Sequence, residues 1–189
     1  MKTSTMLALT VAASLPLLAA EKIGANTNSY WEATAVVPAP KAAPELAWVD
    51  DALARFAANY TVLLTHALAE HTAERPYPKS FKDGRVRYVP DWDWCSGFWP
   101  GALWYLYEAT DDLKWRLAAE RYTDEQSRIR YSNLHHDLGF MFLPSAGNGL
   151  RITGDGRYAG WLYDAARTLQ TRYRPNCRCI QVWGVWGGK

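Results

Sequence analysis

The sequence predicts an all-α protein built from repeated helical pairs. Along several segments, apolar residues recur at spacings of three and four, which is the pattern of one helix face, and we find no convincing alternating strand. The segments "ATDDLKW" (109–115) and "ITGDGRY" (152–158) also align without a gap, 43 residues apart. A period of this length is typical of helical-hairpin arrays and toroids.

The composition is that of a folded domain with an unusual share of aromatic residues. A chain of 189 residues can bury a full core. Its 21 Lys and Arg residues nearly balance 19 Asp and Glu residues, so a nucleic-acid-binding face is not indicated. The ten Trp and eleven Tyr residues exceed what a small core needs. Such rings favour places with one wet edge, such as sugar-binding clefts, exposed helix surfaces and subunit interfaces.

The N-terminal residues have the order of a secretory signal peptide. Residues 1–20 place Lys2 before an apolar stretch that ends in small residues. That stretch is too short and too interrupted by proline to span a bilayer. We therefore expect residues 1–20 to be a signal peptide and the mature protein to be periplasmic or secreted, without a membrane span. The Pro/Ala-rich residues 21–43 are expected to form an N-terminal arm.

Five helices are predicted along the rest of the chain. The first, over residues 44–67, has its apolar positions at Leu46, Val49, Leu53, Phe56, Tyr60, Leu63 and Ala67. Residues 72–95 contain three prolines and many charges and are predicted to form a long loop. The other helices are expected at residues 98–109, 113–131, 138–143 and 158–173. In each of the two aligned breaks, an Asp is placed to cap the next helix.

The three cysteines, Cys95, Cys177 and Cys179, do not suggest a disulfide framework. Their number is odd, and the single residue between Cys177 and Cys179 is a poor spacing for an unstrained bridge. Four His residues make zinc conceivable, but the usual C-x₂-C spacing is missing. Buried or free thiols without a metal ion are expected.

The segment "NLHHDLGF" (133–140) contains the main candidate for chemistry. Asp137 precedes an apolar run, so it can act as a helix N-cap. It can also be a carboxylate at a helix mouth with His136 beside it, and both groups suit carboxylate chemistry on sugars. Adjacent histidines diverge and do not easily share a metal ion. The residues alone leave the cap and the catalytic interpretations open.

The tryptophan-rich segment 91–110 contains a second candidate. Trp99 and Leu103 lie four residues apart in the predicted helix and are expected in the core. Trp94 precedes that helix and is the better candidate for stacking on a sugar, with core packing as the alternative.

Four blocks of the sequence together resemble glycoside hydrolase family 88, the unsaturated glucuronyl hydrolases. They are "WCSGFWPGALWYLYEAT", "HHDLGFM", "ITGDGRYAGWLYDAARTLQTRYRPN" and "IQVW", in this order, and the resemblance runs from about residue 45 to the end of the chain. It implies an (α/α)₆ toroid. It also implies that water adds across the enol-ether double bond of a non-reducing-end unsaturated uronic acid, on oligosaccharides made by polysaccharide lyases. The resulting hemiketal opens and releases the uronate, without a metal or organic cofactor.

The resemblance assigns site residues one by one. Asp137 matches one of two essential aspartates, the one that contacts the sugar hydroxyls, and His136 matches the site histidine beside it. Trp94 and Trp183 match aromatic residues that line the pocket. The second catalytic aspartate, the proton donor, is expected shortly after the Trp183 position and is absent from this chain.

The end of the chain agrees with an incomplete array. The last hairpin of a helical array needs a covering neighbour, but the chain stops at the apolar segment "CIQVWGVWGGK". We therefore expect residues 44–189 to be a partial (α/α)₆-toroid catalytic domain, truncated at its C-terminus and with little or no activity alone.

Two other functions remain open. One is a non-catalytic module that binds uronate oligosaccharides through an open aromatic face, for which Asp137 should be dispensable. The other is a hydrolase of unsaturated rhamnogalacturonan fragments on a related helical toroid, which "HHDLGFM" favours less than family 88.

Overall fold

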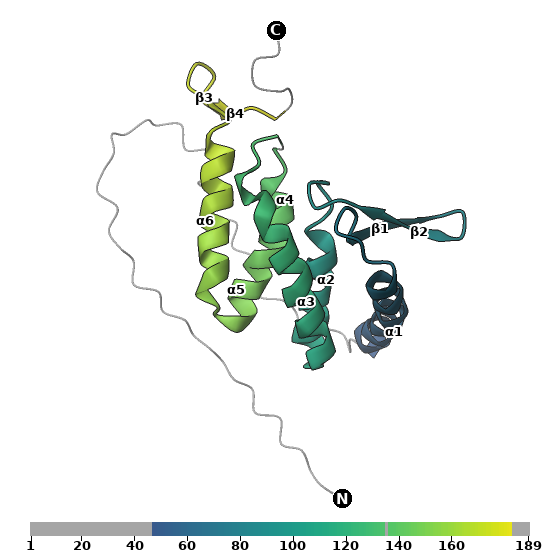
Figure 1. Ribbon diagram of the computed structural model, residues 1–189. Helices are drawn as coiled ribbons and strands as arrows, with labels where there is room; N and C mark the ends of the chain where they lie inside the picture. The colour runs from purple at the N-terminus through teal and green to yellow at the C-terminus, as the bar shows by residue number, and fades with distance from the viewer. Residues whose placement is uncertain (1–46, 135, 183–189) are drawn as a thin grey trace, which may run out of the picture. The chain divides into compact units, whose positions relative to one another are not determined.

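The helices follow the predicted order, with further elements between them. A computed structural model describes residues 47–134 and 136–182 (Figure 1). The predicted signal peptide, the predicted arm and Trp183 lie outside the described residues and stay predictions. The elements are α1 (Ala47–Ala69), β1 (Tyr77–Lys82), β2 (Arg85–Val89), α2 (Phe98–Thr110), α3 (Leu113–Gln126), η1 (Ser127–Tyr131), α4 (Leu138–Phe142), η2 (Leu143–Gly147), α5 (Asn148–Thr153), α6 (Gly156–Gln170), β3 (Tyr173–Arg174) and β4 (Cys179–Ile180).

The prediction of an all-α class built from helical pairs is confirmed. Helix α2 packs against α3, and α6 packs against α4 (Figure 1). Helix α6 also contacts η1. Among the helices of residues 47–134 and 136–182, none is both long enough and apolar enough to cross a bilayer.

The two aligned breaks in the sequence fold into the same corner. Asp112 caps α3 and Asp155 caps α6, each by accepting a hydrogen bond from the backbone N–H two residues on, at 3.0 and 2.9 Å. The residues just before these caps, Asp111 and Gly154, both have left-handed backbones, with φ of 55° and 71°. The aromatic residue that closes each break is buried. The two halves of the repeat therefore share backbone conformation and capping as well as sequence.

The prediction of a loop over residues 72–95 was wrong for its middle part, where β1 and β2 form an antiparallel hairpin. Asp83 and Gly84 make the two-residue turn, with φ of 51° and 74°. Asp-Gly suits such a turn because both positions need a left-handed backbone. Most side chains of the hairpin are exposed. Strand β1 lacks the apolar alternation that marks a half-buried strand, and the alternation in β2, from Arg85 to Tyr88, is only four residues long, the short end of a strand signal. A second short hairpin, β3–β4, was also not expected.

The predicted helix at residues 138–143 is longer and less regular than expected. It continues from α4 through the π-turn η2 into α5. Pro144 has no N–H to continue the regular ladder, and Ser145 Oγ donates to Met141 O at 2.6 Å inside this irregular stretch. Two other boundaries also differ from expectation, since α3 ends at Gln126 before the 3₁₀ turn η1, and α6 spans Gly156–Gln170.

The core is rich in aromatic rings. Trp99 and Leu103 are buried, as predicted. Trp104 Nε1 donates to Thr123 Oγ1 at 3.1 Å, and the Trp104 and Tyr158 rings meet edge to face, with centroids 6.1 Å apart. The polar edge of Trp104 is thus satisfied inside the core, where an unpaired N–H would be costly.

Candidate active site

The loop that carries Trp94 is fixed by its neighbours. The Asp93 carboxylate accepts from Lys79 Nζ on β1, at 2.9 and 3.0 Å, and from the backbone N–H of Cys95 at 3.0 Å. Ser96 Oγ donates to the carbonyl of Asp91 at 2.7 Å. The residues on both sides of Trp94 are therefore held, and the hairpin missed by the sequence prediction supplies one of the contacts.

Trp94 belongs to an exposed cluster of three rings, which we call the aromatic cluster: Trp94, Phe98 and Phe140. The Trp94 centroid lies 6.1 Å from that of Phe98 and 6.4 Å from that of Phe140, with near-perpendicular planes. Phe98 and Phe140 are 6.1 Å apart. Trp94 is 48% exposed and Phe140 is 56% exposed. The alternative interpretation of Trp94 as a core residue is therefore wrong, because nearly half of this residue is exposed to solvent.

Asp137 occupies the N-cap position of α4, but its side chain makes no capping hydrogen bond. Only its backbone carbonyl takes part in the helix start, by accepting from Met141 N at 3.1 Å. The Asp137 carboxylate oxygen Oδ1 lies 3.4 Å from Nε2 of His136, and these side chains are 17% and 22% exposed. The capping interpretation therefore fails for the side chain, which remains accessible beside the imidazole. His135 lies outside the described residues.

Asp137 and the Trp94 loop are electrostatic neighbours. Burial raises the pKa of the Cys95 thiol, with Lys79 opposing the shift and the carboxylates of Asp93 and Asp137 adding to it. The Cys95 thiol is thus held in its protonated form next to the candidate carboxylate. A thiolate nucleophile at Cys95 is disfavoured for this reason.

Two residues that the sequence analysis did not single out hold the loop against α4. Gly97 lies so close to α4 that a Cβ at this position would come 2.1 Å from the carbonyl oxygen of Met141. With its carboxamide oriented so that both ends are satisfied, Gln126 accepts from Gly97 N at 3.0 Å, and its carbonyl oxygen lies 2.7 Å from Ser96 Oγ, whose single proton is shared between this oxygen and the Asp91 carbonyl. In the same orientation it donates to Ser145 Oγ at 2.7 Å and Met141 O at 3.0 Å. Gln126 is fully buried, so this bridge fixes the spacing between the Trp94 loop and the helix that follows Asp137.

Arg172 is a third contributor that the sequence did not reveal. Its side chain is buried, with the residue 2% exposed. Its guanidinium donates to the carbonyls of Gln181 at 2.8 Å, Val182 at 3.2 Å and Asn133 at 2.6 Å. It therefore ties the segment before Trp183 to the segment before His136. Backbone carbonyls carry no side-chain signature, so no motif could indicate this partnership.

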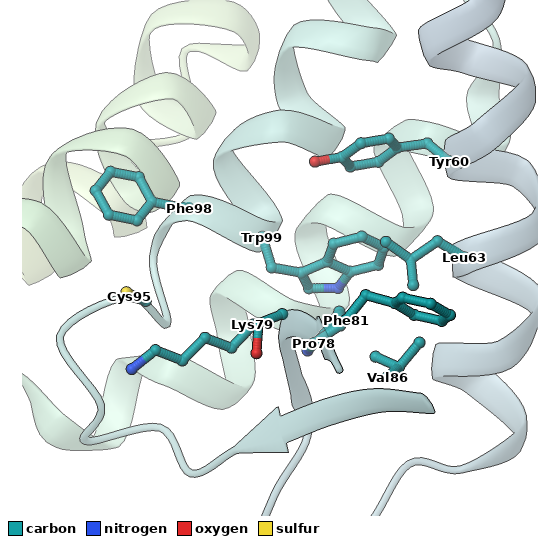
Figure 2. A pocket seen from close by; sticks show the side chains of 10 residues that line it. Tyr60, Leu63, Pro78, Lys79, Phe81, Val86, Cys95, Phe98 and Trp99 are labelled. Atoms are coloured by element: carbon teal, nitrogen blue, oxygen red, sulfur yellow. The ribbon is translucent and has the colours of Figure 1, made fainter. Parts of the chain in front are cut away.

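Two pockets meet at Phe98. One, of about 400 Å³, lies between α1, the β1–β2 hairpin and the start of α2. Figure 2 shows Trp99 at its centre and Lys79 running along it toward the loop that carries Cys95. The other, of about 540 Å³, is lined by His136, Phe98 and Phe140, among others. The second pocket therefore joins part of the aromatic cluster to the histidine beside Asp137, and it is the better candidate for a ligand.

The predicted site residues that the structure describes thus come together in part. The Trp94 ring contacts the Phe140 ring. His136 and Phe140 both line the larger pocket. Phe98 and Phe140 are members that the sequence did not single out. In the part of the chain that the structure describes, no group of three or more His, Cys, Asp or Glu side chains is placed to hold a metal ion. The expected lack of a cofactor stays a prediction.

Comparison with known proteins identifies relatives of one kind. No protein-family model matches the chain. An unsaturated glucuronyl hydrolase of Bacillus sp. (strain GL1) is 38% identical over 110 residues, which is 56% of this chain and 29% of that protein. One of Formosa agariphila is 35% identical over 99 residues, which is 52% of this chain and 25% of that protein. The resemblance seen in the sequence is thereby confirmed over about half of the chain.

Solved structures give the same result for the fold. The crystal structure of an unsaturated glucuronyl hydrolase specific for heparin matches with a TM-score of 0.62 and 36% identity, covering 73% of this chain and 38% of that one. A variant of the Streptococcus agalactiae enzyme complexed with dGlcA-GalNAc6S matches with a TM-score of 0.51 and 26% identity, covering 66% and 33%. The fold prediction is confirmed at this level. The chain spans between a quarter and two fifths of the length of these relatives.

Proposed function

We propose that this chain, a homologue of the unsaturated glucuronyl hydrolases over about half of its length, contributes to the hydrolysis of oligosaccharides that carry an unsaturated uronic acid at the non-reducing end. In this proposal the aromatic cluster supports the sugar ring and Asp137 contacts its hydroxyls, with His136 beside it. Water adds across the enol-ether double bond, and the hemiketal formed then opens to release the uronate.

The observation that supports the proposal best is that the Asp137 carboxylate does not cap its helix. A carboxylate at a helix start normally satisfies a backbone N–H, but this side chain does not, and it lies 3.4 Å from His136 Nε2 instead. Exposed aromatic rings stand on the same short segment and on the adjoining loop. A sugar presents hydroxyls at its rim and C–H groups on its faces, so it matches a carboxylate beside rings. The complex with dGlcA-GalNAc6S in a similar structure agrees with this substrate class.

The test measures binding and hydrolysis separately. Binding of an unsaturated uronate disaccharide is followed by calorimetry, and hydrolysis by loss of the ultraviolet absorbance of its double bond. Binding is the primary readout, because the proton-donating aspartate expected from the resemblance has no counterpart among the residues assigned. Asp137→Asn should weaken binding about tenfold or more, since a hydrogen bond to a charged group contributes roughly 1.5–3 kcal/mol.

Asp83→Asn is the matched control. Asp83 is an exposed aspartate in the hairpin turn, and Asn tolerates its left-handed backbone equally well. This variant should bind like the unchanged chain. The proposal fails if the unchanged chain does not bind the unsaturated disaccharide, or if both variants bind equally well.

A non-catalytic binding module is the second candidate, and the solvent exposure of the aromatic cluster favours it. In that case Trp94→Ala should abolish binding, Asp137→Asn should leave it unchanged, and no double bond should be consumed. The two candidates are therefore separated by the same set of measurements.

Export is proposed on the sequence pattern of residues 1–20 alone. Expression in a bacterial host with a periplasm should yield a product shortened by about that length in the periplasmic fraction. A full-length product confined to the cytoplasm would contradict the signal-peptide interpretation.

A further inference from the structure

Cys177 and Cys179 face each other in the β3–β4 hairpin. Their sulfur atoms lie 2.6 Å apart, and both residues are exposed and free. Arg178 between them has a left-handed backbone, with φ of 51°, and Cys179 pairs with Arg174 across the hairpin. The sequence analysis judged this spacing poor for an unstrained bridge. The left-handed backbone of Arg178 lies in the turn between the two cysteines, and this turn brings the two thiols together.

The surroundings of the pair are those of a reactive dithiol. Cys177 Sγ also lies 3.7 Å from the carbonyl of Arg174. A hydrogen bond from the Cys179 thiol lowers the pKa of Cys177, and the positive charge of Arg174 acts in the same direction. The same contact raises the pKa of Cys179. The contact therefore favours Cys177 as the more nucleophilic partner, with Cys179 holding the proton of their shared hydrogen bond.

We propose that Cys177 and Cys179 form a dithiol site that closes to an intramolecular disulfide by exchange with a small disulfide such as glutathione disulfide. The Cys177 thiolate attacks one sulfur of glutathione disulfide, forming a mixed disulfide and releasing one glutathione thiolate. The Cys179 sulfur, after losing its proton, then attacks Cys177 Sγ and releases the second glutathione. The two thiols are oxidised, one glutathione disulfide is reduced to two glutathiones, and the two protons pass to the released thiolates.

The site is independent of the proposed hydrolase activity. Cys95 is only partly exposed, and burial raises the pKa of its thiol, with the nearby carboxylates of Asp93 and Asp137 adding to the shift. It is therefore expected to stay reduced under the same conditions and provides an internal reference.

The reduced chain is equilibrated with glutathione and glutathione disulfide, the free thiols are capped with a maleimide, and the peptides are identified by mass spectrometry. We expect the peptide with Cys177 and Cys179 to lose two hydrogens and take up no label, while Cys95 is labelled. The proposal is overturned if both hairpin cysteines are labelled in full under the oxidising mixture. A bridge from either of them to Cys95, or between two chains, also overturns it.

Two further measurements test the proposal: the glutathione adducts formed by variants with one hairpin cysteine, and the equilibrium constant for disulfide closure in the unfolded chain. Cys179→Ser should accumulate the mixed glutathione disulfide on Cys177, because the resolving thiol is gone. Cys177→Ser should accumulate the mixed disulfide on Cys179 in the same way, because its partner for closure is gone too. The equilibrium constant for closure should fall about tenfold in concentrated urea if the folded hairpin holds the thiols together. Equal constants in the folded and unfolded chain would show that the hairpin contributes nothing.

Discussion

Removal of the Arg172 guanidinium should destabilise the folded chain strongly. Arg172→Met keeps the length of the side chain but removes all donors to the carbonyls of Asn133, Gln181 and Val182. Each such bond from a charged donor contributes roughly 1.5–3 kcal/mol, and the three share one group, so they do not add fully. The carbonyls also regain some water. We expect a loss of about 3 kcal/mol in the free energy of unfolding.

The assay is urea unfolding followed by tryptophan fluorescence and circular dichroism. With a slope of about 2 kcal/mol per molar urea, the midpoint should fall by about 1.5 M. Arg172→Lys keeps the charge but offers one nitrogen without the planar fork, so it should recover less than half of the loss. Arg167→Met changes an exposed arginine on α6 and should alter stability by no more than about 0.5 kcal/mol. A result for Arg172→Met equal to that control would refute the reasoning.

Three further changes are expected to have measurable effects. Gly97→Ala should cost about 2–3 kcal/mol in urea unfolding and weaken sugar binding, because its methyl group would overlap the Met141 carbonyl; an unchanged midpoint would contradict the contact. Asp112→Ala and Asp155→Ala should each cost about 1 kcal/mol and shift the melting temperature similarly, since both cap the same corner; a clear difference would show that the corners are not equivalent. Partial desolvation raises the pKa of Asp124 above its ordinary value, although its side chain is 46% exposed and pairs with Arg157. A small contribution to stability is therefore present at low pH and is lost as pH rises through the folded pKa. Between pH of about 3 and about 6, the free energy of unfolding of Asp124→Asn should therefore fall by less than that of the unchanged chain. Urea unfolding curves of both proteins at the two pH values check this.

The sequence predicted the parts of the fold that depend on local patterns. The corners at Asp112 and Asp155 depend on capping hydrogen bonds to backbone groups two residues away, and both corners lie where the sequence predicted them. The β1–β2 hairpin was missed because β1 is mostly exposed and lacks an apolar alternation, and the alternation in β2 is only four residues long. The Asp83-Gly84 pair was the other available signal.

The candidate site was predictable to the extent that its residues have chemical character of their own. Asp137 and Trp94 could be proposed from residue type, and the structure shows that the Asp137 side chain is not a cap. Phe98 and Phe140 looked like ordinary helix residues, and their exposure depends on how the loop meets α4. Contacts such as those of Gln126 and Arg172 join segments far apart in the chain, mostly through backbone groups, so no local pattern encodes them.

The repeated corner has a consequence for the order in which the chain folds. Each corner satisfies its backbone groups from residues close in sequence, so α2–α3 and α5–α6 can form as local hairpins before any contact between them, and such contacts form quickly. The segment before Asp137 is joined to Arg172 across 39 residues and depends on the later association of these hairpins. The catalytic candidate would then assemble last during folding and be the first region to open in the native state, where hydrogen exchange would be fastest.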